Sequence, residues 1–228
     1  MARNETAGIS LDVALDDTPA TVSVDNLIIA GWTSRDVAAM EAHIRELEEL
    51  GVTRPESTPV FYRVAAAMLT TAGAIQVSGP HSSGEVEYVM LNHAGEWWVT
   101  VGSDHTDREA ETVGVSLSKQ MCHKPVGRTW WRFADVKDHW DELQLKSWIV
   151  DGEDRILYQD GGVAAMKRPE ELAGLYGGLN ENWAMFGGTL AAIGGVRPAP
   201  GFALELHDPV RNKTISHAYR TDVLPVEG

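Results

Sequence analysis

The sequence predicts a mixed α/β fold in which β-strands dominate. Short alternating segments such as AIQVSG, GEVEYVML and EWWVTVG are separated by glycines and by the turn sequence NHAG. Only one long segment, TSRDVAAMEAHIRELEELG, has clear helical spacing. The length of 228 residues fits one domain, and 43% hydrophobic with 23% charged residues is ordinary for a globular protein. We therefore expect residues 1–228 to form a single domain.

The N-terminal part of the chain is expected to contain strands followed by the main helix. Residues 10–30 alternate as strands do and end in an apolar run. Thr33 and Asp36 form a box-like helix start, and Gly51 supplies the stop. The segment 60–73, VFYRVAAAMLTTAG, is compatible with either a helix or a strand.

From residue 74 onward, the pattern is typical of strands and turns. Strands are predicted at 74–79, 84–91 and 96–102, and a short helix or a loop at 108–121. The remaining predicted elements are two strands around the turn DGED at 151–154, a short helix at 168–178, and a strand pair at 201–226.

The composition disfavours several classes of function. A net charge of −14 would repel a nucleic acid duplex and an anionic membrane, so we expect neither as a partner. Cys122 is the only cysteine, which excludes an intrachain disulfide and a cysteine-based zinc site. No signal-peptide pattern is present, and no run reaches the roughly 18 apolar residues of a membrane span. We expect a cytoplasmic protein.

Three carboxylates are the first candidate functional residues. Glu85 and Glu87 are two apart on a predicted strand, so they share a face with Cα atoms about 6.6 Å apart. Val89 and Leu91 continue that face. Asp104 follows the next strand, just past Gly102-Ser103. Like charges beside apolar side chains need compensation by a cation or by a cationic side chain, and oxygen ligands at this spacing suit Mg²⁺, Mn²⁺ or Ca²⁺.

Simpler interpretations of these carboxylates remain open. E-x-E alone is a weak motif, and the two glutamates could belong to a solvated strand face. Asp104 could cap an Asx-type turn.

Several segments in order resemble the fumarylacetoacetate hydrolase superfamily. GEVEYVML, VTVGSDHTDRE and SLSKQMCHKPVG resemble its E-x-E strand, its G-N-D-x-x-x-R turn and its lysine ahead of a Pro-Val/Leu-Gly segment. LKSWIVDGEDRILYQDG resembles its hairpin, and AMFGGTLAAIGG its late glycine loop. The similarity covers roughly residues 60–226. It implies a β-roll or sandwich with a few peripheral helices, with residues 1–58 packing on a 59–228 core.

The resemblance implies a metal site and its surroundings. Glu85, Glu87 and Asp104 would ligate Mg²⁺ or Mn²⁺, and Lys119 would hold or polarise substrate oxygens. The expected substrate-binding residues are Arg63, Arg108, Gln120, Gly188 and Thr189. Simpler interpretations are a surface lysine for Lys119, an internal ion pair with Asp107 or Glu109 for Arg108, and a tight turn for the loop at 187–189. The sequence departs from the family pattern at Ser103, at Arg63-Val64 and at Leu190. These departures indicate a divergent bacterial branch.

Family members that hydrolyse C–C bonds carry an N-terminal His/Glu dyad, written N-Y-x-x-H-x-x-E. Here only His43-x-x-Glu46 is present, on the predicted helix. Residues three apart are neighbours on a helix, so Glu46 could orient His43 to activate water. The alternative is a boundary histidine beside a solvated acidic run.

These expectations combine into a metal-dependent hydrolase that acts on a small oxo acid or acylpyruvate-like substrate in catabolism. The same metal site could instead serve decarboxylation, isomerisation, dehydration or amide/enamide hydrolysis. A non-enzymatic binding protein is the alternative from another class. The family also implies a homodimer.

Overall fold

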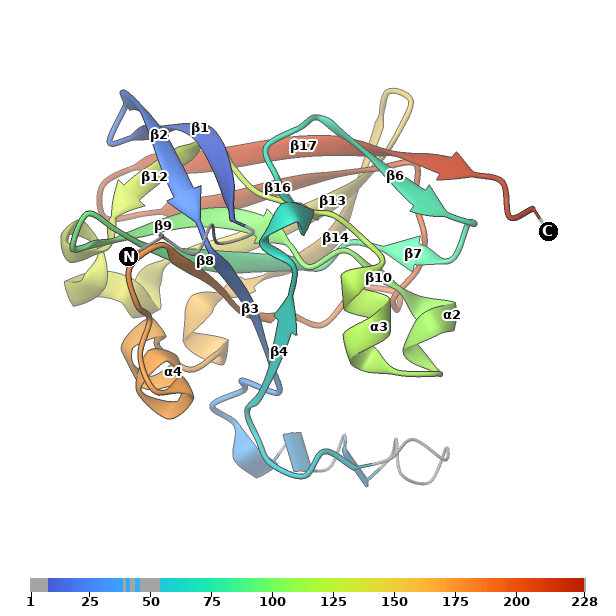
Figure 1. The fold of residues 1–228 in the computed structure, drawn as a ribbon, viewed down its shortest axis with the longest axis horizontal. Coiled ribbons are helices and arrows are strands. Elements are labelled where there is room, and N and C mark those ends of the chain that lie inside the picture. The colour runs from blue at the N-terminus through green and yellow to red at the C-terminus, as the bar shows by residue number, and fades with distance from the viewer. Residues whose placement is uncertain (1–7, 39, 42–43, 46–53, 228) are drawn as a thin grey trace, which may run out of the picture.

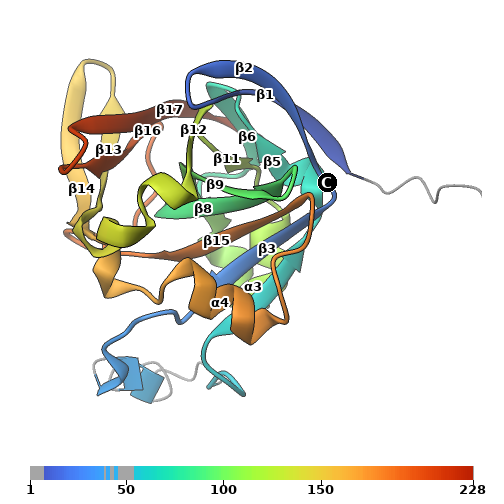
Figure 2. The same cartoon turned by 90° about the vertical axis from the view of Figure 1, so that its left-hand side faces the viewer.

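The largest sheet of the described structure has eight strands and is curled (Figure 2). The computed structural model describes residues 8–38, 40–41, 44–45 and 54–227. The sheet has the order β2-β1-β12-β9-β8-β15-β3-β4 and curls around the molecule in Figure 2. Its strands are β1 (Ile9–Leu15), β2 (Thr18–Val24), β3 (Asn26–Gly31), β4 (Val60–Val64), β8 (Val86–His93), β9 (Glu96–Ser103), β12 (Thr129–Arg132) and β15 (Trp183–Thr189).

A second sheet of five strands, in the order β14-β13-β16-β17-β6, lies across the first, with the long strand β17 along the top of Figure 1. Its strands are β6 (Ala74–Ser78), β13 (Gln144–Asp151), β14 (Asp154–Gly162), β16 (Gly201–Asp208) and β17 (Lys213–Leu224). Two small ribbons pair β5 (Leu69–Thr70) with β11 (Lys124–Pro125), and β7 (Ser82–Ser83) with β10 (Thr106–Asp107). The prediction of a β-dominated fold is confirmed.

The helices are few and peripheral. Those with α-helical geometry over their full described length are α2 (Arg108–Glu111), α3 (Val115–Gln120) and α4 (Pro169–Tyr176), and α4 is seen below β15 in Figure 2. Within the described residues, 3-10 turns cover Ala66–Met68, Phe133–Asp135, Lys137–Glu142 and Val163–Ala165. The segment 60–73 is therefore strand, turn and strand, and 108–121 forms two short helices. No described helix has the length and hydrophobicity needed to cross a membrane.

The helix predicted at 33–51 is described only in part. Residues 37–38, 40–41 and 44–45 are helical, and Met40 and Ile44 are buried. The dyad candidates His43 and Glu46 lie outside the described residues. The N-terminal strands join the eight-stranded sheet: β3 pairs with β15 and β4, and β1 pairs with β12.

Strand β8 is buried on both faces. Val86, Tyr88 and Met90 belong to one hydrophobic cluster, which extends to the five-stranded sheet. Val89 and Leu91 belong to another, which extends to β1 and β2. The predicted alternation of faces along this strand is therefore confirmed, and the carboxylates at its start lie at the edge of a fully packed core.

Candidate functional site

The ends of two neighbouring strands bring the three carboxylates together. Strands β8 and β9 are antiparallel, so the start of β8 lies beside the end of β9, with Glu87 opposite Gly102. The Asp104 amide donates to the Glu85 carbonyl at 3.0 Å, which holds the turn after β9 against Glu85. The Glu85 side chain is 17% exposed, whereas Glu87 and Asp104 are 2% and 1% exposed.

Two buried lysines contact Asp104. The Lys119 amine, from α3, donates to Oδ2, and the Lys124 amine, from β11, lies 3.0 Å from Oδ1. Burial raises the pKa of Asp104, but attraction to Lys119 and Lys124 outweighs it, so the pKa lies well below its ordinary value. Burial lowers the pKa of Lys119, but Asp104 and Glu85 raise it above its ordinary value. Asp104 and Lys119 are therefore held in their charged forms.

Glu87 has a different environment. Its Oε2 accepts a hydrogen bond from the Gly188 amide at 2.7 Å. Burial, and then repulsion by Asp104, raises the pKa of Glu87 well above its ordinary value. Among the described residues, no cationic side chain forms an ion pair with it. The structure thus holds a buried carboxylate whose charged form is poorly compensated.

Arg108 binds groups of the protein itself. Its Nε donates to Ser83 Oγ at 2.7 Å and its Nη1 to Glu111 at 2.9 Å. Nη2 lies 3.2 Å from Glu85 Oε1, an ion pair without hydrogen-bond geometry. The ion-pair alternative is thus present, but its partners are Glu85 and Glu111 instead of the neighbours in sequence.

Ser103 stands where the resembled family has asparagine, and it supports the turn. Its Oγ accepts from the Glu85 amide at 3.1 Å and from the Tyr219 hydroxyl at 2.8 Å. His105 lies behind it, with Nδ1 3.0 Å from the Tyr219 oxygen and Nε2 2.9 Å from Ser82 Oγ. Burial, and then nearby cations, lowers the pKa of His105 to about 3, so the imidazole is neutral. This hydrogen-bonded chain fixes the backbone of Glu85.

The late glycine loop follows a shift in the pairing of β15 with β8, between Phe186 and Thr189. Gly188 has φ +101°, and a Cβ there would lie 1.9 Å from Thr33 Oγ1. Glycine is therefore needed for the backbone conformation and for the close approach of Thr33. The Thr189 hydroxyl donates to the Val86 carbonyl at 2.8 Å. Residues 187–189 thus form an irregular end of β15, and the simpler interpretation of a tight turn is wrong.

Replacing Gly188 with alanine is expected to destabilise the protein by about 2–4 kcal/mol. The cost of the left-handed backbone at a non-glycine residue and the cost of the steric overlap with Thr33 both contribute. Urea unfolding would measure the change. Gly174→Ala is the control, because this helical position has open space around a new Cβ and should gain about 0.5–1 kcal/mol. Equal stability of Gly188→Ala and wild type would contradict the assigned loop conformation.

Arg63 is not brought to the carboxylates. Its Nη1 donates to the Tyr176 oxygen at 3.2 Å, and its guanidinium lies 5.5 Å from the centre of the Trp183 ring. Its neighbour Tyr62 has its ring centre 5.7 Å from the Lys119 amine. Since adjacent strand residues point to opposite faces, Arg63 faces away from Lys119 and Tyr62 faces it.

Gln120 also has a partner within the fold, because its Oε1 accepts from the Ala65 amide at 2.8 Å. This bond ties α3 to the end of β4 and thereby helps to place Lys119. Two further residues of this region, Lys124 and Gln159, were not predicted from the sequence. Gln159 was contained in the recognised hairpin motif, whereas nothing near Lys124 in the sequence indicated burial.

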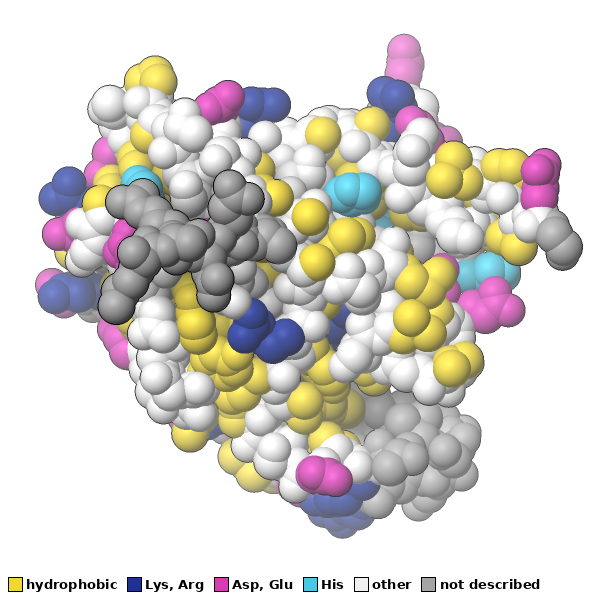
Figure 3. All heavy atoms as spheres, in the orientation of Figure 1, with side chains coloured by type: hydrophobic (Ala, Val, Ile, Leu, Met, Phe, Trp, Pro, Cys, Tyr) yellow, Lys and Arg dark blue, Asp and Glu magenta, His cyan; other side chains and the backbone are white. Residues whose placement is uncertain are grey.

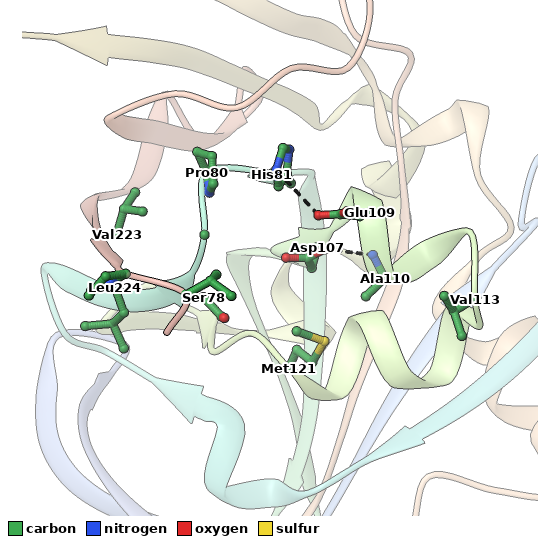
Figure 4. A pocket seen from close by; sticks show the side chains of 13 residues that line it. Ser78, Pro80, His81, Asp107, Glu109, Ala110, Val113, Met121, Val223 and Leu224 are labelled. Carbon is green, nitrogen blue, oxygen red and sulfur yellow. Dashed lines mark hydrogen bonds and ion pairs between the residues drawn. The ribbon is translucent and has the colours of Figure 1, made fainter. Parts of the chain in front are cut away.

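The structure also has a cavity of about 680 Å³, and the three carboxylates are not among the residues that line it. Figure 4 shows it between the turn after β6, helix α2 and the end of β17, with His81 Nε2 3.4 Å from Glu109 Oε2 at its rim. Val113, Met121 and Val223 line it and are exposed, and apolar side chains are visible over this region in Figure 3. A ligand in this cavity would contact α2 and β17.

The donor set fits a hard divalent cation, because it consists of carboxylates without sulfur or imidazole. The poorly compensated Glu87 also favours a cation at this place. In the present arrangement Asp104 is paired with lysines and Glu85 with Arg108. Accordingly, within the described ranges no three acidic, His or Cys side chains form a ready ligand cluster. Binding a cation to all three carboxylates requires these ion pairs to rearrange.

The fold is similar to that of several solved fumarylacetoacetate hydrolase family proteins. A yeast fumarylacetoacetate hydrolase family protein, ynq8, is 19% identical with a TM-score of 0.61, covering 90% of this chain and 95% of that chain. A fumarylpyruvate hydrolase from Pseudomonas aeruginosa, solved with Mn²⁺ and pyruvate, is 16% identical with a TM-score of 0.65, covering 98% and 99%. A 2-keto-3-deoxy-D-arabinonate dehydratase is 15% identical with a TM-score of 0.65, covering 88% and 74%.

The sequence itself identifies a narrower group. Residues 30–219 match the family described as "Protein of unknown function (DUF2848)", and the chain belongs to that family. No curated protein matches the sequence. The low identities to the solved structures show the shared fold and leave the reaction to be argued from the site.

Proposed function

We propose that this chain is a metal-dependent enzyme that acts on a small oxo acid, with a divalent cation held by Glu85, Glu87 and Asp104. The observation that carries this proposal is the buried Glu87 carboxylate, which has a raised pKa and one backbone hydrogen bond and lies beside two further carboxylates. A cation bound there would relieve the repulsion that the carboxylates exert on one another. Mg²⁺ and Mn²⁺ are the proposed ions.

When bound, the cation would supply Lewis acidity toward the carbonyl oxygen of the substrate. The protein residues have separate tasks. Lys119 holds a fixed positive charge beside the carboxylates and is proposed to bind a substrate oxygen. Lys124 and the Gly188 amide orient Asp104 and Glu87. The packed residues of β8 on both faces keep bulk water away from Glu87.

Hydrolysis of a C–C bond in an acylpyruvate-like compound is the first candidate reaction. Its support is the shared fold with a fumarylpyruvate hydrolase solved with Mn²⁺ and pyruvate. In this proposal His43, oriented by Glu46, would activate the water molecule.

Dehydration of an oxo acid is the second candidate, supported by the similar fold of the dehydratase. Product analysis after incubating the Mn²⁺-loaded protein with acylpyruvates and 2-keto-3-deoxy acids distinguishes the two reactions. Hydrolysis yields two organic products, whereas dehydration yields one organic product and water.

Removing divalent cations with a chelator is expected to lower the melting temperature of the protein. A ligand at 100 times its Kd stabilises the folded state by about 2.7 kcal/mol, so added Mn²⁺ or Mg²⁺ should restore the loss. Differential scanning fluorimetry with elemental analysis measures both. An unchanged melting temperature together with no bound metal after Mn²⁺ incubation would refute the metal site.

A further inference from the structure

Three hydrogen bonds form a closed ring around Val86, the residue between the two candidate glutamate ligands. The Val86 amide donates to Gln159 Oε1, Gln159 Nε2 donates to Thr189 Oγ1, and Thr189 Oγ1 donates to the Val86 carbonyl, each at 2.8 Å. Both backbone polar groups of Val86 are thus bonded by side chains.

The ring lies where the regular pairing of β15 with β8 is interrupted. The register shifts between Phe186 and Thr189, so Thr189 lies opposite Glu87 after Gly187 and Gly188. At this interruption, side chains bond the backbone of Val86. The interruption also points the Gly188 amide at Glu87 Oε2.

Gln159 is held rigidly and connects the two sheets. It comes from β14 of the five-stranded sheet and is 1% exposed. Its Oε1 also accepts from Ser147 Oγ at 2.9 Å, and its Nε2 also donates to the Leu190 carbonyl at 2.6 Å. All four hydrogen-bonding positions of the amide are therefore filled, so its orientation is fixed.

We propose that Gln159 and Thr189 are positioning residues that set the spacing of Glu85 and Glu87 for cation binding. Fixing the backbone of Val86 also fixes the backbone positions of its neighbours Glu85 and Glu87. Fixing Thr189 maintains the hydrogen bond from the Gly188 amide to Glu87. The inference rests on the proposed function, because it concerns the geometry of that metal site. It assigns Thr189 a role through Val86 in place of substrate contact.

Isothermal titration calorimetry of Mn²⁺ binding to folded variants tests whether the ring affects the affinity of the site. Gln159→Met and Thr189→Val remove its hydrogen bonds with little change in volume, and each is expected to raise the Kd for Mn²⁺ about 10-fold. Thr189→Ser keeps the hydroxyl and should bind within about 2-fold of wild type. Ser147→Ala is the matched control, because it removes one bond to the same Gln159 oxygen and leaves the ring intact.

The outcomes distinguish this inference from the proposed function. If wild type binds Mn²⁺ and Thr189→Val binds it equally well, the positioning role is refuted and the metal site stands. A lower melting temperature of the metal-free variants with an unchanged Kd for Mn²⁺ would also refute the positioning role, because it shows a role in folding alone. Absence of Mn²⁺ binding by wild type refutes both. Thr189→Val decides the question if Gln159→Met fails to fold.

Discussion

An Asp104→Asn variant is expected to be about 3–5 kcal/mol less stable than the wild type at neutral pH, because it leaves buried lysines without their anion. Lys124 is fully buried and the Lys119 side chain is 8% exposed, and both contact the Asp104 carboxylate. The low pKa of Asp104 has the same cause. Urea unfolding of the metal-free protein measures the loss.

Two further variants give this experiment its controls. Asp222→Asn removes the partner of Arg220 in an exposed ion pair and should leave the stability nearly unchanged. Adding Lys124→Met to Asp104→Asn removes one of the unpaired charges and should recover part of the loss. A loss below about 1 kcal/mol for Asp104→Asn would show that other groups neutralise the lysines.

A Glu87→Gln variant is expected to be more stable than wild type in the absence of metal at neutral pH, and to gain nothing from Mn²⁺. The pKa of Glu87 is raised in the folded protein, so folding favours the protonated form. That contribution is fully present below the unfolded pKa of about 4.5 and is lost as the pH rises through the folded pKa. Glutamine keeps the neutral state at every pH.

The pH dependence of thermal unfolding checks the sign of this effect. Metal-free wild type should lose stability relative to Glu87→Gln as the pH rises above about 4.5. The stabilisation by Mn²⁺ should grow over the same range, because the cation binds the carboxylate form. Exposed Glu96→Gln serves as the control for loss of one negative charge. A Glu87→Gln variant that still gains stability from Mn²⁺ would remove Glu87 from the ligand set.

Much of the β-rich fold followed from local patterns. The alternation along β8 correctly assigned its two faces, because each face packs on a separate hydrophobic cluster. The solvated-face alternative is wrong for Glu87, which is 2% exposed. The sequence could not separate these cases, because E-x-E looks the same whether a second layer of structure covers it or not.

The contacts of the candidate site depended on long-range packing. Lys124 precedes a proline and has no local mark of burial, yet the parallel pairing of β11 with β5 places it beside Asp104. Arg63 was predicted to bind substrate, but the orientation of β4 turns it toward Tyr176. Such contacts follow from how distant strands align, which the spacing of neighbours does not encode.

The position of β8 between two hydrophobic clusters has a kinetic consequence for the candidate metal centre. Strands buried on both faces exchange their amide hydrogens only when most of the molecule opens. Opening of this strand is therefore too rare to serve as the route by which a cation enters or leaves. Exchange of a cation would instead depend on motion of the side chains that pair with the carboxylates, Lys119 with Asp104 and the more exposed Arg108 with Glu85.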